Sequence, residues 1–179
     1  GDCPIEVKLT PEEYEERYRL GLRSREADQY FALLGEIDDA LRTDDFMRVV
    51  AAARRTLPLL PMVVEALIKD GTVKRGEPLI DQIGFPPLQR VPKIAAISMQ
   101  SSYLDEAEAA VASHPLLSDF AEEIAAARET SRIASKALVH VRANPGDLQK
   151  DLGRAISESP QKSSNIASWL ERAGFIRRE

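Results

Sequence analysis

The sequence predicts an all-α protein in two parts, an array of helices over residues 1–128 and a smaller helical unit over residues 129–179. Apolar residues recur at the three- and four-residue spacing of amphipathic helices along most of the chain. Prolines, glycines and capping residues divide the chain into segments of helical length. No segment alternates apolar and polar residues for long, and the one short candidate strand is Phe175-Ile176-Arg177.

The first two expected helices precede Arg42. Thr10 is followed by Pro11 and, three residues after Thr10, by Glu13, which together form a typical helix start. The apolar stripe of this helix is Tyr14, Tyr18 and Leu22. A second stripe at helical spacing consists of Tyr30, Phe31, Leu34, Ile37 and Leu41.

Two more helices and a loop follow. The acidic turn at Asp44 suits a helix N-terminus, and the stripe that starts at Phe46 predicts a helix that Pro58 ends. The segment Leu59–Lys69 is expected to form a fourth helix. Three glycines and three prolines make residues 71–87 the most loop-like stretch, which would serve as a hinge, as a partner-binding arm or as a simple connection.

Residues 30–128 also show an internal repeat with an offset of 57 residues, which places Phe46 on Tyr103 and Pro58 on Pro115. The strings TDDFMRVVAAARRTLP and QSSYLDEAEAAVASHP both resemble the second helix of a tetratricopeptide-type hairpin, although units of that family recur at about 34 residues. Any two alanine-rich amphipathic helices that end at a proline would also align in this way. Either interpretation predicts stacked helices with a groove that commonly holds a peptide or another protein.

The C-terminal 50 residues predict three helices and a strand. The first helix is expected to end at Asn144-Pro145-Gly146, and Asp147 can cap the second. Ser159-Pro160 opens the third helix, which Gly174 ends. The inward residues are Leu148, Leu152 and Ile156 in the second helix, and Ile166, Trp169 or Leu170, and Ala173 in the third. Helix, helix, turn, helix, glycine and strand is the order of a winged helix-turn-helix.

Two stretches of this unit, NPGDLQKDLGRAIS and SNIASWLERAGFIRRE, resemble bacterial winged-helix regulators of the MarR and ArsR kind. The most specific part is LERAGFIRRE, because the recognition helix of that family ends in Leu-Glu-x-Ala-Gly, two hydrophobic residues and two arginines. The matched residues are Leu148, Leu152, Ile166, Leu170, Glu171, Ala173, Gly174, Phe175, Ile176, Arg177 and Arg178. The turn SESPQKS is longer than in the family, and a second wing strand does not fit before Glu179.

The resemblance implies that the third helix lies in the major groove of duplex DNA, with its N-terminal polar face toward the bases. The candidate contacts are Gln161, Lys162, Ser164, Asn165 and Ser168. Glutamine and asparagine can bond adenine bidentately, lysine can reach guanine, and serine suits a base or a phosphate. Polar residues at this place would otherwise be helix caps and solvated surface.

Arginines near the expected wing would bind phosphates. Arg177 and Arg178 would neutralise the DNA backbone and so set the affinity and its salt dependence, and Arg172 points the same way. The alternative for the terminal arginine pair is a solubilising chain end. Trp169 is interpreted as core and not as a base-stacking platform, because it lies on or beside the buried stripe.

Charge divides the chain in the same way. Residues 130–179 carry nine Lys and Arg against five acids, a net charge of +4, whereas residues 1–129 carry 15 basic and 24 acidic residues, a net charge of -9. Such an asymmetry favours two parts with different partners, the basic one facing a polyanion. The basic charge is modest, so we expect a homodimer where the protein binds a single DNA site.

Patterns for catalysis and for metal binding are missing from the sequence. Neither His114 nor His140 has a cysteine, an acid or a second histidine at metal-ligand spacing, so both are interpreted as structural or surface residues. Adjacent acids such as Asp38 and Asp39 point in different directions on a helix. Nucleotide, zinc and serine-hydrolase motifs do not occur. We therefore expect no enzyme, no cofactor and no metal.

The composition is that of an ordinary globular protein, with 44% hydrophobic and 30% charged residues. The single Cys3 can form no disulfide within the chain, and no run approaches the ~20 apolar residues of a membrane span. The start GDCPIEV lacks the basic and apolar regions of a signal peptide. We therefore expect a cytoplasmic protein without membrane association.

Two functions are expected from these features. The first is a DNA-binding transcriptional regulator, in which the winged helix binds duplex DNA and the helical array supplies oligomerisation or senses a protein or peptide partner. The alternative is a non-enzymatic interaction scaffold, because helical repeats that end in a winged helix also resemble PCI-type subunits of multi-protein assemblies. The surface around Lys162 and Arg177 should be positive for DNA binding and should carry an apolar patch for a scaffold.

Overall fold

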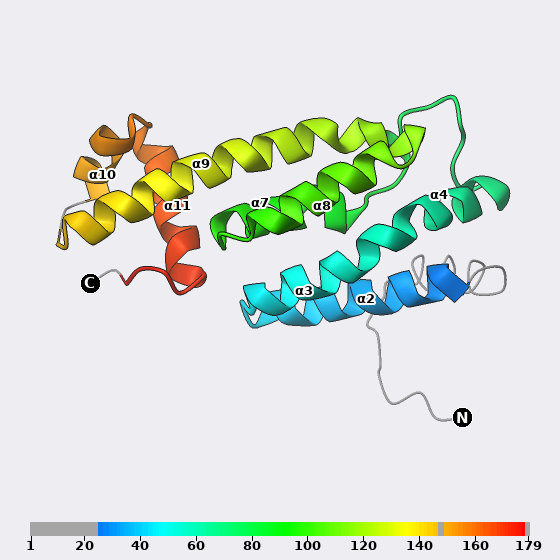
Figure 1. The fold of residues 1–179 in the computed structure, drawn as a ribbon, viewed down its shortest axis with the longest axis horizontal. Helices are drawn as coiled ribbons and strands as arrows, with labels where there is room; N and C mark the ends of the chain where they lie inside the picture. The colour runs from blue at the N-terminus through cyan, green and yellow to red at the C-terminus, as the bar shows by residue number, and fades with distance from the viewer. Residues whose placement is uncertain (1–24, 147–148, 178–179) are drawn as a thin grey trace.

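The structure of the protein is a computed structural model that describes residues 25–146 and 149–177. Every regular element in these two ranges is a helix (Figure 1), which confirms the all-α class. None of these helices is long and apolar enough to span a membrane. The expected helix that begins at Thr10 lies outside the described residues, and so do Asp147, Leu148 and Arg178.

The first layer of the fold is antiparallel (Figure 1). It consists of α2 (Arg25–Arg42), α3 (Phe46–Thr56), the 3-10 turn η1 (Leu57–Leu59) and α4 (Leu60–Lys69). Asp45 caps α3, since its side chain accepts a hydrogen bond from the backbone N–H of Arg48 at 3.2 Å. Pro58 lies in η1, and Gly71 follows α4 with a φ of 84°. The expected second, third and fourth helices are therefore confirmed.

Residues 71–87 contain more regular structure than a loop. Residues 71–78 and 83–85 have no helix, as expected of the most loop-like stretch, but α5 (Leu79–Gln82) lies inside it and α6 (Pro86–Gln89) begins in it. Two prolines occupy the first turn of α6, where a helix needs no N–H group. The buried Leu79 is fixed at the start of α5 because its N–H donates to Oδ2 of Asp119 at 2.5 Å.

The second layer packs on α3. It consists of α7 (Val91–Ile97), α8 (Ser101–Ala112), the 3-10 helix η2 (Pro115–Phe120) and α9 (Ala121–Ala143). α9 lies along α7 and α8, on the side away from α2 (Figure 1). The fully buried Tyr103 donates its hydroxyl to the carbonyl oxygen of Pro87 and so ties α8 to α6.

The two segments that the 57-residue offset aligns have the same order of elements. α3, η1 and α4 form helix, 3-10 turn and helix, and α8, η2 and α9 repeat that order. Phe46 and Tyr103 are both buried, and Pro58 and Pro115 both lie in the 3-10 elements. The tetratricopeptide-like stacking itself stays a prediction.

The C-terminal unit adds α10 (Gln149–Ile156) and α11 (Pro160–Arg172). The hydroxyl of Ser159 accepts a hydrogen bond from the backbone N–H of Lys162 at 3.2 Å and so caps α11. Gly174 ends the helix with a φ of 84°, a conformation that glycine adopts without a steric cost. Both predicted boundaries of α11 are confirmed.

The strand predicted at Phe175-Ile176-Arg177 is wrong, because this segment has no regular secondary structure. The N–H of Phe175 donates instead to the carbonyl oxygen of Leu170 at 2.9 Å and closes the C-terminal cap of α11. Phe175 and Ile176 pack, half-buried, on the core of the C-terminal unit. A strand also needs a partner strand, and residues 25–146 and 149–177 contain none.

The core consists of two clusters of buried apolar side chains. The larger cluster lies within residues 27–127. The smaller cluster comprises Ile97, Ile133, Ala134, Ala137, Leu152, Ile156, Ile166, Ala167 and Leu170, chiefly from α9, α10 and α11. Trp169 and Ala173 pack against both clusters. The boundary expected between residues 128 and 129 falls inside α9, which contributes to both.

Candidate functional site

The sequence-predicted site lies on α11, which packs on α9 and α10. Ser163, Ile166, Ala167 and Leu170 are buried in this packing. Gln161, Lys162 and Asn165 are exposed on the opposite face, and Ser164 and Ser168 are half-buried beside them. The apolar stripe of α11 therefore turns the N-terminal polar residues outward, as an amphipathic helix requires.

Neighbouring side chains hold this polar face in place. The Nε2 group of Gln161 donates to Oδ1 of Asn165 at 3.1 Å, one helical turn away. The Nζ atom of Lys162 lies 3.5 Å from Oε2 of Glu158. The pair of Gln161 and Asn165 is exposed and contributes little to stability, whereas the Glu158 side chain is only 18% exposed, so water screens its ion pair with Lys162 less. The structure thus brings together Gln161, Lys162 and Asn165.

α9 adds charged residues that sequence reasoning missed. Arg132 hydrogen-bonds Glu129 and thereby lowers the pKa of Glu129, and the charges of Lys162 and Lys136 add smaller contributions in the same direction. The Nζ atom of Lys136 also lies 3.5 Å from the carbonyl oxygen of Ile156, at the end of α10. Arg132 and Lys136 are four residues apart in the sequence, and this spacing indicates that they lie on one face of α9.

Arg172 does not join the polar face. Its guanidinium donates to Oδ1 of Asp44 at 2.6 Å, and this hydrogen bond lowers the pKa of Asp44 and raises that of Arg172. The same guanidinium lies 4.5 Å from the ring centroid of Trp169 and 5.6 Å from that of Phe46. A DNA contact by Arg172 would therefore have to break a contact with the helical array.

Trp169 and Arg177 lie apart from the polar face as well. The ring of Trp169 is 5.8 Å from the ring of Phe46 and packs between the two core clusters, which fits its interpretation as core. Arg177 is exposed but follows the C-terminal end of α11. From Gln161 to Arg172 the helix rises roughly 16 Å, so Arg177 and the polar face are at opposite ends.

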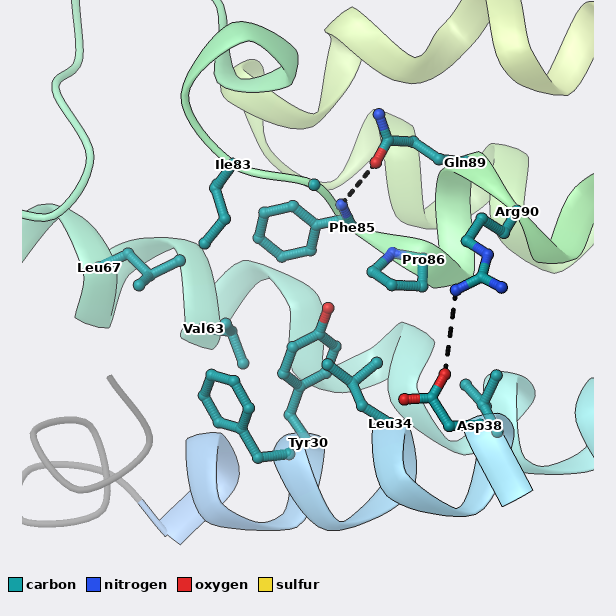
Figure 2. A pocket seen from close by; sticks show the side chains of 13 residues that line it. Tyr30, Leu34, Asp38, Val63, Leu67, Ile83, Phe85, Pro86, Gln89 and Arg90 are labelled. Carbon is teal, nitrogen blue, oxygen red and sulfur yellow. Dashed lines mark hydrogen bonds and ion pairs between the residues drawn. The ribbon is translucent and has the colours of Figure 1, made fainter. Parts of the chain in front are cut away.

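A second candidate site is a cleft of about 370 Å³ between α2, α4 and residues 83–90. Tyr30 and Leu34 of α2 form one wall, and Figure 2 shows Leu67 of α4 with Ile83 at the end away from Arg90. The ring of Phe85 packs 5.9 Å from the ring of Tyr30. The cleft therefore has an apolar, aromatic interior.

Charged and polar side chains gather at one end of this cleft (Figure 2). The Nη1 atom of Arg90 lies 3.9 Å from Oδ1 of Asp38. The side-chain Oε1 of Gln89 accepts a hydrogen bond from the N–H of Phe85 at 2.9 Å. A Cβ atom on Gly84 would lie 2.9 Å from that same oxygen, so the backbone at Gly84 passes close to the side chain of Gln89.

Sequence reasoning missed the cleft because it treated residues 71–87 as a loop. Apolar residues inside this stretch, Ile83 and Phe85, were the available signal, since a solvated loop has little use for them. The other wall comes from α2 and α4, which lie far away in the sequence.

His114 has a structural role. Its Nδ1 atom accepts a hydrogen bond from the N–H of Leu116 at 3.1 Å and so caps η2, and its Nε2 atom lies 2.8 Å from Oε1 of Glu65. The hydrogen bond with His114 lowers the pKa of Glu65. Across the described part of the chain, no three His, Cys, Asp or Glu side chains are grouped to hold a metal ion.

Compared with family models, with curated proteins and with solved structures, the chain has no significant match. The winged-helix and tetratricopeptide resemblances therefore stay predictions that rest on the quoted residues. A function has to be inferred from the geometry of α11 and of the cleft.

Proposed function

We propose that the protein binds duplex DNA through the N-terminal half of α11 and acts as a transcriptional regulator. The observation that supports this proposal best is the exposed face of Gln161, Lys162 and Asn165 on a helix packed against α9 and α10. A helix presented in this way can enter the major groove with its N-terminal residues toward the base edges.

The surface of α11 is polar, but Lys162 faces two acids, Glu158 at 3.5 Å and Glu129, whose pKa the charge of Lys162 helps to lower. Within the described ranges, the large hydrophobic side chains that are exposed are Met47, Met62 and Val139. They belong to α3, α4 and α9, so none lies on α10 or α11. A scaffold that docks a partner on α11 would need an apolar patch on this face.

The side chains on this face have the chemistry for reading bases. Gln161 and Asn165 each carry an amide that can bond adenine bidentately, and Lys162 can donate to guanine. The N-terminal N–H groups of α11 favour a phosphate nearby, because the helix dipole is positive there. The contact of Asn165 with Gln161 is exposed and DNA can replace it at little cost, whereas Glu158, the partner of Lys162, is only 18% exposed.

The experiment is a fluorescence anisotropy titration of a labelled random-sequence duplex, first at about 50 mM salt and then at higher salt, where a phosphate-dependent complex weakens. Lys162→Ala and the double variant Gln161→Ala, Asn165→Ala should weaken binding. Lys69→Ala is the matched control, because it removes one exposed lysine at the end of α4. No binding at the lowest salt, or equal losses in Lys162→Ala and Lys69→Ala, would overturn the proposal.

The second candidate is an interaction scaffold. The contact of Arg172 with Asp44 favours it, since one predicted DNA cation is bound to the helical array. This contact also joins the C-terminal unit and the array into one surface, which a scaffold needs. Failure of the DNA titration together with capture of a defined protein partner would favour this function.

A further inference from the structure

The segment that forms α3, η1 and α4 is basic, although it belongs to the acidic part of the chain. Residues 46–69 have a net charge of +3. Residues 1–129 together have a net charge of -9, so the rest of that part, without this +3, has -12. The charged residues of the segment are Arg48, Arg54, Arg55, Lys69 and, as the one acid, Glu65. A positive segment within an acidic surface attracts an anionic partner.

The outer side of this segment is a continuous stripe at helical spacing. α3, η1 and α4 follow one another without a gap (Figure 1). Residues that recur every three or four positions share one side of a helix. Five such residues are all exposed here, namely Met47, Ala51, Arg55, Pro58 and Met62. From the first to the last of them the stripe extends roughly 22 Å, about four helical turns.

Two methionines make the stripe apolar. The side chains of Met47 and Met62 are 63% and 44% exposed, and the other exposed large hydrophobic side chain among the described residues, Val139, belongs to α9. The Sδ atom of Met47 accepts a hydrogen bond from Nε2 of Gln100 at 3.3 Å, at the start of α8. Thioether side chains adapt to the shape of an apolar partner. Exposed apolar residues in a row, with charges beside them, are typical of an interaction surface.

The arginines beside the stripe differ in how they are bound. Arg54 donates to Oε2 of Glu106 on α8 at 2.5 Å. Arg48 lies 3.8 Å from Oε1 of Glu36, beyond hydrogen-bond distance. Arg55, within the stripe itself, forms no ion pair with any residue in the described part of the chain. The guanidinium of Arg55 can therefore bind a carboxylate of a partner without giving up an ion pair with one of these residues.

We propose that this stripe binds an amphipathic helix of a partner protein, with acidic residues along the edge of its apolar side. The apolar side chains of that helix cover Met47, Ala51 and Met62, and a carboxylate pairs with Arg55. A helix docks in this way through anchors one and two turns apart, and a stripe of about four turns accommodates them. Duplex DNA is also anionic, but it would leave the methionines against phosphates and gain little hydrophobic free energy. The stripe does not depend on DNA binding by α11.

The test uses a fluorescein-labelled peptide of about 18 residues, with leucine on one helical side and glutamate along both edges of that side. The full chain is titrated into the peptide, and fluorescence anisotropy follows binding. We expect saturable binding with a Kd below about 100 µM. The same peptide with lysine in place of glutamate should bind at least about fivefold more weakly, because its charges repel Arg55.

Variants place the peptide on the stripe. Arg55→Gln should weaken binding about threefold, and the double variant Met47→Ser, Met62→Ser about fivefold or more. These side chains are exposed, and a thermal melt followed by circular dichroism checks that the variants fold. Arg142→Gln and Val139→Ser are the matched controls, because they replace an exposed arginine and an exposed apolar residue of α9. Both controls should bind the peptide as the wild type does.

Three results would overturn the proposal. The first is no saturable binding of the glutamate peptide up to about 1 mM, or the same affinity in Arg55→Gln as in the wild type. The second is displacement of the peptide by a random-sequence duplex, which would assign the stripe to polyanions in general. The third is a dimer in sedimentation velocity that the double variant Met47→Ser, Met62→Ser abolishes, which would assign the stripe to a second copy of the chain.

Discussion

Arg172 donates a hydrogen bond to Oδ1 of Asp44 at 2.6 Å, although 128 residues separate the two in the sequence. Asp44 lies in the turn between α2 and α3, where its φ is 52°. The guanidinium also stacks near the rings of Trp169 and Phe46. This contact fixes the C-terminal end of α11 on the helical array, whereas Gln161 and Lys162 at the N-terminal end are exposed.

Replacing Arg172 should loosen that attachment. We expect Arg172→Ala to lower the free energy of unfolding by about 1–2 kcal/mol, because it removes a cation–π contact and an exposed ion pair. Trp169 is the single tryptophan, so its fluorescence in a urea titration reports this region directly. Arg172→Lys keeps the charge but loses the planar stack, and its stability should lie between those of the wild type and Arg172→Ala.

The contribution of the contact between Arg172 and Asp44 to the unfolding free energy can be measured with Asp44→Asn. Asparagine tolerates the positive φ at this position, so the variant removes the charge without straining the turn. A double-mutant cycle with Arg172→Ala should give a coupling of about 0.2–1 kcal/mol, as for other exposed pairs. Strictly additive effects would show that the hydrogen bond contributes nothing.

Acid should weaken the same contact. The hydrogen bond from Arg172 holds the pKa of Asp44 below its usual value of 3.8. Because the pKa is lower in the folded protein, the stabilisation by Asp44 is complete above the unfolded-state pKa and is lost as the pH falls through the folded-state pKa. The difference in unfolding free energy between wild type and Asp44→Asn should shrink from about pH 5 to about pH 3. A difference that stays constant over this range would contradict the assignment.

Gly153 and Ser163 set the approach of α10 to α11. A Cβ atom on Gly153 would lie 3.1 Å from Oγ of Ser163, whose hydroxyl is buried and has no hydrogen-bond partner among the described residues. Gly153→Val should lower the unfolding free energy by about 1–3 kcal/mol through overpacking. Ser163→Ala should be neutral or stabilising.

The two positions should also be coupled. With the hydroxyl gone, Gly153→Ala should stabilise by roughly 0.5–1 kcal/mol, because alanine is the better helix former. In the presence of Ser163 that gain should be smaller or reversed. Thermal unfolding of the four proteins measures the coupling, and equal effects of Gly153→Ala in both backgrounds would rule out the close approach.

Gly84 should be sensitive because of its neighbour. In Gly84→Ala the new methyl group meets Oε1 of Gln89 and displaces it from the N–H of Phe85. We expect a loss of about 0.5–1.5 kcal/mol from this hydrogen bond. Gly76→Ala is the control, since a Cβ there meets no atom within 4 Å. Chemical denaturation compares the two, and equal stability would show that the hydrogen bond is dispensable.

Local signals predicted most helices and their ends. Ser159 before Pro160 and Gly174 after Arg172 act through neighbouring backbone groups, so the sequence alone contains what is needed to place them. The strand at residues 175–177 failed because a strand depends on a partner strand, which no local pattern supplies.

The sites depend more on contacts that are remote in the sequence. The polar face of α11 follows from its helical period, so Gln161, Lys162 and Asn165 could be placed on one side in advance. Arg172 was expected on the same surface, because the sequence around it gives no sign of its partner Asp44, which lies 128 residues away. The cleft could not be predicted for the same reason, since its walls come from three separate segments.

The most direct test of DNA binding by α11 is a ¹H–¹⁵N NMR titration of the labelled protein with a short random-sequence duplex at low salt. The proposal predicts that the backbone amides of Gln161, Lys162 and Asn165 shift most, and that Lys162→Ala reduces these shifts. The amides of α4, on the far side of the array, should stay unchanged. Shifts that leave α11 unaffected, or no shifts at all, would contradict the proposal.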